Sequence, residues 1–235
     1  MLNFKNYDFK RYNFALLVVV TMLISIGIFL IKQVRPEDYK KQVIGLIGGL
    51  FIALIVSVID YHFIAQFYIV LYLINLILLL LVKFIGVEYN NAQRWLDLKF
   101  FKLQPSELTK IILIIFFAKI FTMFEQKINN GIFLLIVIIL MAVPTYLILT
   151  QTDLSTSIVL MTIFAMLVFT AGLSWKIILP IIIIGIPAFY GLFWYVQQDY
   201  QKILTPNQQQ RVLSILHPEE YPATMYQQEN SVQAI

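Results

Sequence analysis

The sequence predicts an all-α fold: a polytopic bundle of transmembrane helices. The chain has 235 residues, of which 60% are hydrophobic and only 13% are charged. Its mean hydropathy of +0.82 is far above that of a soluble domain. The apolar residues also form runs long enough to cross a bilayer, separated by short polar segments.

The first half of the chain contains three predicted spans. A short basic arm precedes the first, and Pro36 prevents the helix from continuing into the second. The first apolar run lacks a small-residue cleavage site, so we expect it to stay as a membrane helix. Asn75 in the third span is predicted to form a hydrogen bond between helices, the usual role of an isolated amide in a membrane bundle. The predicted spans are residues 13–31, 43–59 and 63–82.

A polar, aromatic-rich loop follows at residues 86–104 and runs into a fourth span at 108–124. Pro105 suits the first position of that helix, because its missing N–H would be unpaired there anyway. Glu107 and Lys110 are three residues apart and therefore share one helix face. An ionisable pair near the membrane boundary is a candidate site. An ordinary structural ion pair is the alternative interpretation.

Three further spans are predicted before the composition changes. Pro144 is expected to kink the fifth, and Asp153 stands in a tight polar turn just before the sixth. A carboxylate at that position can be a simple N-cap, so Asp153 is open to that interpretation as well as to a site role. These spans are residues 131–149, 154–172 and 175–196, which makes 1–196 a seven-span bundle and 197–235 a polar extramembrane segment.

Composition excludes several classes of function. The chain has no Cys and two distant His residues, so disulfides, thiolate catalysis and zinc or haem sites are not expected. The net charge of +4 comes from basic residues scattered between the spans. We therefore expect membrane lipids, and not nucleic acid, as partners.

Three polar motifs follow one another along the second part of the chain. The first joins 92–96, AQRWL, to 104–110, QPSELTK, and the second is the turn 149–156, LTQTDLST. The third is in the tail, where 210–212, QRV, precedes 217–220, HPEE, and 226–228, YQQ. Together they resemble the SEDS family, which includes RodA, FtsW and SpoVE. The stretch after Trp95 and the Pro-Glu-Glu tail are more similar to the RodA branch than to FtsW.

The resemblance implies a peptidoglycan glycosyltransferase that polymerises lipid II, a disaccharide-pentapeptide on undecaprenyl pyrophosphate. It also implies a ten-span fold in a bacterial inner membrane, a class B penicillin-binding protein as partner, and a role in cell elongation and shape. The N-terminus is then cytoplasmic and the segment 197–235 extracytoplasmic, although counting Lys and Arg alone favours the opposite orientation. The cofactor stays open, with a divalent cation as one candidate.

By matching position, the resemblance places Lys110, Glu107 and Asp153 in a substrate-binding cavity. Arg94 and Gln104 are further candidates, for contacts to the substrate or to the loop. Lys110 is assigned to a pyrophosphate oxygen, with Glu107 holding it in place.

Two departures from the family pattern accompany this assignment. Thr152 and Ser155 stand where the family has Pro and Gly, so we expect a less rigid turn. The family's general-base Asp and last three spans have no counterpart in these 235 residues. We therefore expect no catalytic residue here, a truncated chain, and no glycosyl transfer by it alone.

Two functions from other classes stay open. Intramembrane charges beside kinked helices also mark transport paths, so a lipid II flippase is one alternative. Transport needs access from both faces of the membrane, whereas the charged residues here collect at one face, which favours the enzyme. The second alternative is a non-catalytic scaffold of the elongation or division machinery.

Overall fold

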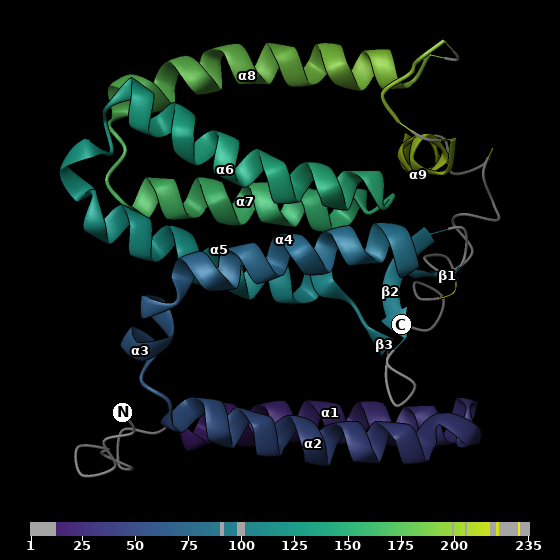
Figure 1. Cartoon of the computed structure of the whole chain (residues 1–235). Helices are drawn as coiled ribbons and strands as arrows, with labels where there is room; N and C mark the ends of the chain where they lie inside the picture. Colours follow the sequence, from purple (N-terminus) through teal and green to yellow (C-terminus); the bar gives the residue numbers. More distant parts are fainter. Residues whose placement is uncertain are drawn as a thin grey trace. The chain divides into compact units, whose positions relative to one another are not determined.

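The computed structural model describes residues 13–89, 92–97, 102–198, 200–204 and 206–216, with the single positions 220 and 230. It contains seven long helices, in agreement with the predicted polytopic helical fold (Figure 1). Five stretches among these residues are long and apolar enough to cross a membrane: Phe14–Val34, Pro36–Val58, Tyr68–Ile85, Gly131–Thr150 and Trp175–Val196. The other two long helices, α5 and α7, lie at the predicted fourth and sixth spans. Helix α5 carries three charged side chains, and α7 is shorter, with 17 residues.

The chain divides into two compact units, residues 1–67 and 68–235. The first contains α1 (Phe14–Val34), the 3₁₀ turn η3 (Pro36–Asp38), α2 (Tyr39–Val58) and the short α3 (Tyr61–Gln66). Asn13 and Asp60 cap α1 and α3 with their side-chain oxygens. Helix α2 begins four residues before the predicted span, because Pro36 ends α1 but starts a turn that leads directly into helix.

The predicted third span, 63–82, is wrong as a single helix. The structure ends α3 at Gln66 and starts α4 (Tyr68–Ile85) two residues later, with a non-helical backbone at Phe67. That stretch contains neither proline nor glycine, so the sequence carries no signal for the break.

The second unit places α4, α5 (Pro105–Met123), α6 (Gly131–Thr150) and α7 (Leu154–Thr170) around one core. Buried residues of α5 lie at its centre, among them Leu113, Phe117 and Phe121. Asn75 of α4 accepts a hydrogen bond from Thr109 Oγ1 of α5 at 2.6 Å, which confirms the predicted interhelical bond. Helix α5 is therefore fixed to α4 by packing and by a buried polar contact.

Three short strands interrupt the helices where the sequence suggested only a loop. They are β1 (Val87–Tyr89), β2 (Ala92–Asp97) and β3 (Lys102–Leu103), antiparallel in the order β1-β2-β3. Gly86 makes the transition from α4, where a Cβ would collide with the Val82 carbonyl oxygen. This sheet stands at the end of the unit where α4 ends and α5 begins (Figure 1).

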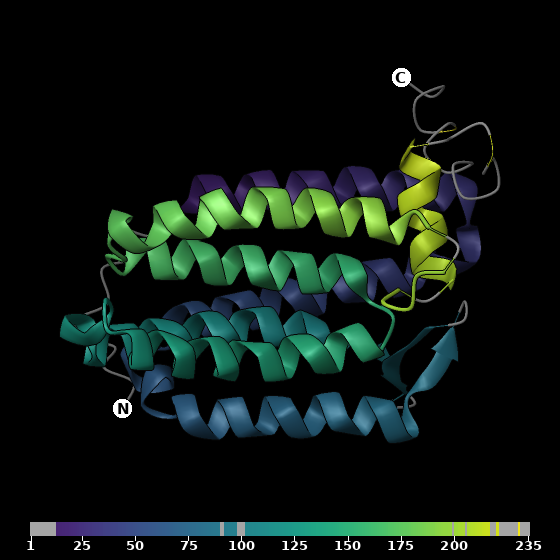
Figure 2. The same cartoon turned by 90° about the horizontal axis from the view of Figure 1, so that it is seen from above.

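The remaining elements are α8 (Trp175–Val196), the 3₁₀ turn η4 (Glu125–Lys127) between α5 and α6, and α9 (Pro206–Leu216). Helix α9 crosses the end of α8 in Figure 2, and Gln209 Nε2 donates to the Val196 carbonyl oxygen at 3.0 Å. The polar segment after residue 196 therefore contains a helix that packs against the end of α8. The end of α8, the sheet and the α6–α7 turn lie at the same end of the second unit (Figure 1).

Candidate functional site

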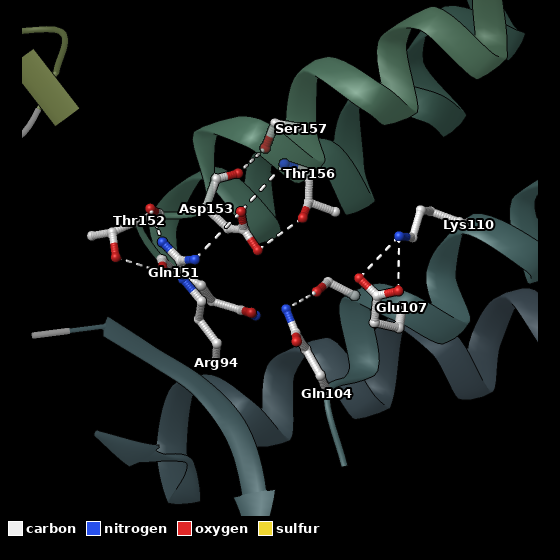
Figure 3. Close-up of polar contacts among 10 residues, drawn as sticks. Arg94, Gln104, Glu107, Lys110, Gln151, Thr152, Asp153, Thr156 and Ser157 are labelled. Atoms are coloured by element: carbon white, nitrogen blue, oxygen red, sulfur yellow. Dashed lines mark hydrogen bonds and ion pairs between the residues drawn. The ribbon is translucent and has the colours of Figure 1, made fainter. Parts of the chain in front are cut away.

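The candidate site lies at that end, where α5 and α7 both begin (Figure 3). Strand β2 supplies Arg94, the first two turns of α5 supply Glu107 and Lys110, and the α6–α7 turn supplies Asp153. Gln104 stands just before α5 and donates to Ser106 Oγ at 3.1 Å. The structure therefore brings all five predicted site residues to one end of the second unit.

Asp153 is the N-cap of α7. Its Oδ1 accepts from the Thr156 backbone N–H at 3.2 Å, and its Oδ2 accepts from Thr156 Oγ1 at 2.9 Å. The residue is 3% exposed. The capping interpretation of Asp153 is confirmed, and its contact with a substrate stays a prediction.

Arg94 binds the α6–α7 turn by three contacts. Its Nη1 lies 3.6 Å from Asp153 Oδ1, its Nε donates to the Gln151 carbonyl oxygen at 3.4 Å, and its Nη2 donates to the Thr152 carbonyl oxygen. The side chains of Arg94 and Asp153 are 19% and 5% exposed. Arg94 therefore holds a main-chain turn and neutralises a buried carboxylate, which makes the guanidinium part of the local fold.

Gln151 makes a buried hydrogen bond that the sequence did not predict. Its Nε2 donates to the Leu79 carbonyl oxygen of α4 at 3.1 Å, and the residue is 5% exposed. No local pattern signals this bond, because its two ends are 72 positions apart in the sequence. Arg94 and Gln151 together attach the turn to both β2 and α4.

Thr152 adopts a left-handed backbone conformation, with φ of 60°. A proline, whose ring holds φ near −65°, does not fit this conformation, so the turn departs from a proline-containing one in backbone as well as in sequence. A β-branched residue in the left-handed region is strained by roughly 1 to 2 kcal/mol.

We expect Thr152→Gly to stabilise the folded chain by about 1 kcal/mol, because glycine adopts positive φ without that strain. Thermal unfolding in detergent measures the effect. Thr150→Gly, two residues earlier at the last position of α6, is the matched control and should destabilise slightly, by a few tenths of a kcal/mol. Equal losses of stability in both variants would contradict the strain at Thr152.

Glu107 and Lys110 form a second polar group on α5. Lys110 Nζ lies 2.9 Å from Glu107 Oε1 and 2.8 Å from Oε2, with side chains 28% and 56% exposed, respectively. Figure 3 draws no interaction between this pair and the Arg94–Asp153 group, and it shows Gln104 between the two. The site thus has one closed ion pair at the turn and one more accessible pair on α5.

The described ranges contain no group of three or more Asp, Glu or His side chains suited to hold a metal ion.

Comparison with known proteins decides the family. The profile of a family described as cell cycle protein, covering FtsW, RodA and SpoVE, matches residues 9–235. The chain belongs to this family. Its apolar helices and this membership make it a multi-pass membrane protein.

Curated relatives in this family are named peptidoglycan glycosyltransferases. Escherichia coli MrdB is 35% identical over 156 residues, which cover 65% of this chain and 39% of MrdB. Treponema pallidum RodA is 27% identical over 222 residues, 87% of this chain and 50% of that protein. A probable peptidoglycan glycosyltransferase FtsW from Trichlorobacter lovleyi is 29% identical over 233 residues, which cover 93% of this chain and 58% of that protein. The chain therefore spans about two fifths to three fifths of the length of these relatives.

Solved structures show the same fold. A chain from a peptidoglycan synthase complex, described as coordinating polymerization and crosslinking, superposes with a TM-score of 0.72 at 28% identity. The match covers 88% of this chain and 60% of that one. Thermus thermophilus RodA superposes with a TM-score of 0.65 at 26% identity, and the match covers 78% of this chain and 60% of that one.

Proposed function

We propose that this chain takes part in polymerising lipid II, as a RodA-like peptidoglycan glycosyltransferase of cell elongation and cell-shape control. The names of the relatives support the reaction class. The RodA-like stretch after Trp95 and the Pro-Glu-Glu tail favour elongation over division. The proposed substrate site is the polar group at the start of α5 and α7.

The observation that carries this proposal is that the Lys110–Glu107 pair is more accessible than the Arg94–Asp153 pair. Arg94 is occupied by two main-chain carbonyl oxygens and by Asp153. The Lys110 ammonium, in contrast, contacts a carboxylate whose side chain is 56% exposed. A phosphate oxygen can approach this ammonium without breaking the contacts that hold the turn. Lys is a common point-charge ligand of phosphate.

Lys110 would contribute by stabilising charge. Glycosyl transfer from lipid II breaks the bond between the sugar and the pyrophosphate, so negative charge grows on the leaving pyrophosphate oxygen. An ammonium fixed beside that oxygen stabilises the charge as it forms. Glu107 orients the Lys110 side chain, and the positive end of the α5 dipole also stabilises negative charge at this point.

Lipid II binding by the purified chain in nanodiscs tests the proposal. We expect Lys110→Ala to raise the Kd for lipid II roughly ten- to hundredfold, the usual value of a hydrogen bond to a charged group. Lys119→Ala is the matched control, because Lys119 lies on the same helix about two and a half turns further. Its Kd should equal that of the parent chain.

Glu107→Gln separates substrate binding from a structural ion pair. In the proposed role it weakens binding less than Lys110→Ala, because the ammonium remains. If both variants lower the unfolding temperature equally and leave the Kd unchanged, the pair is structural and the pyrophosphate role is wrong. Passage of lipid II across liposomes that contain the chain would favour a flippase.

We also propose the orientation and the partner. A cytoplasmic N-terminus puts the sheet, the α6–α7 turn and α9 on the outer face, where basic residues attract an anionic lipid substrate. A class B penicillin-binding protein is the proposed crosslinking partner. The similarity to a chain of a complex that polymerises and crosslinks supports this assignment.

A further inference from the structure

A largely apolar cavity lies at the opposite end of α5 from the candidate site. It is a groove of about 490 Å³ between the last turns of α5 and the first turns of α6. The α5–α6 connection, which includes η4, is at its mouth, and the groove extends along α6. Apolar side chains form most of its walls, among them Ile120, Phe124, Ile132, Phe133, Ile136 and Leu140.

The polar residues of the groove stand at its mouth. Lys127 lies with its Nζ 5.5 Å from the centre of the Phe124 ring. Within the described part of the chain, no carboxylate lies within ion-pair distance of this ammonium. Asn130 uses its Oδ1 to cap α6, accepting from the backbone N–H groups of Ile132 and Phe133 at 2.9 and 3.2 Å. Its amide N–H₂ group is a donor, and Asn130 lines the groove together with Lys127.

The turn η4 separates charges of opposite sign. Glu125, two residues before Lys127, lines a different hollow of about 320 Å³ between α5 and α7, together with Thr122 and Thr170. The groove between α5 and α6 therefore contains the cation without the neighbouring anion. The positive end of the α6 dipole adds further positive potential at the mouth of this groove.

We propose that this groove binds an anionic phospholipid of the surrounding leaflet. An acyl chain lies along the apolar wall toward Ile136 and Leu140, and the phosphate contacts Lys127 and the Asn130 amide. The position suits such a ligand, because the mouth stands where one membrane helix ends and the next begins, at headgroup depth. Basic pockets between membrane helices are known to hold anionic headgroups. A lipid without net charge can also pack its acyl chain against the apolar walls, but it brings no net negative charge to pair with Lys127.

Native mass spectrometry of the full chain, released from detergent containing equimolar phosphatidylglycerol and phosphatidylcholine, tests this proposal. We expect the chain to retain phosphatidylglycerol about fivefold over phosphatidylcholine, the preference that one basic residue near a headgroup provides. Lys127→Ala should reduce the preference to about one, and Lys127→Arg should keep it. Ile136→Trp, which fills the groove and leaves the charge, should reduce retention of both lipids.

Lys176→Ala is the matched control, because Lys176 is an exposed lysine at the same end of the unit but does not line the groove. Its lipid preference should equal that of the parent chain. The proposal is overturned if the parent chain retains both lipids equally, or if Lys127→Ala keeps the preference. It is also overturned if Lys176→Ala lowers the preference as much as Lys127→Ala does. Unchanged helix content by circular dichroism identifies folded variants, and Lys127→Gln replaces Lys127→Ala if the latter does not fold.

Discussion

Arg94→Ala is expected to destabilise the chain by about 3 to 5 kcal/mol, the usual cost of removing one partner from a buried ion pair. The substitution leaves the Asp153 carboxylate, only 5% exposed, without its counter-charge. It also removes the donors to the carbonyl oxygens of Gln151 and Thr152. Reversible unfolding in mixed micelles measures the change.

Two further variants identify the cause. Arg35→Ala, at an exposed arginine of the first unit, should change stability by less than about 0.5 kcal/mol. Adding Asp153→Asn to Arg94→Ala should restore part of the loss, because the uncompensated charge is gone while the amide oxygen can still cap α7. If the double variant is no more stable than Arg94→Ala, the ion pair is not the source of the effect.

Phe117→Ala should destabilise by a similar amount, about 3 to 5 kcal/mol. The Phe117 ring is fully buried, and its centre lies 5.1 Å from Phe116, 5.8 Å from Phe121 and 5.0 Å from Phe164. In a membrane these packing contacts, more than exclusion of water, hold the helices together. The expected loss therefore reflects the cavity that alanine leaves.

Phe189→Ala provides the comparison for Phe117. Phe189 is 63% exposed on α8, so its removal should leave the stability of the second unit nearly unchanged. The same unfolding assay applies to both variants. Equal losses would show that ring size, and not burial between α5 and α7, determines the effect.

The sequence predicted the long helices well, because membrane helices must be apolar along their whole length. Pro105 located the start of α5, and the polar turn before residue 154 located the start of α7. The break at Phe67 was missed because no helix-breaking residue marks it. The strands β1 to β3 were missed because two- to six-residue strands rich in polar side chains have no clear period.

The same contrast holds at the site. The Glu107–Lys110 pair follows from helix spacing alone. The contact between Arg94 and Asp153 joins residues far apart in the chain, so no local pattern contains it. The Gln151 bond to the Leu79 carbonyl oxygen was missed for the same reason. Helix spacing thus predicted one ion pair, the resemblance to the family named the other candidate residues, and only the tertiary fold showed how they are grouped.

The contacts that hold the α6–α7 turn have a consequence for how the family can diverge. Arg94 and Gln151 engage three main-chain oxygens, those of Gln151, Thr152 and Leu79. Every amino acid carries such an oxygen, so the side chain at 152 can change through evolution while the architecture around Asp153 is inherited, whereas Leu79 is also held by its place in the core. We expect substitution to be rarer at the two donors, Arg94 and Gln151, and at the carboxylate of Asp153. Homologues should therefore vary in the turn's side chains sooner than in these three.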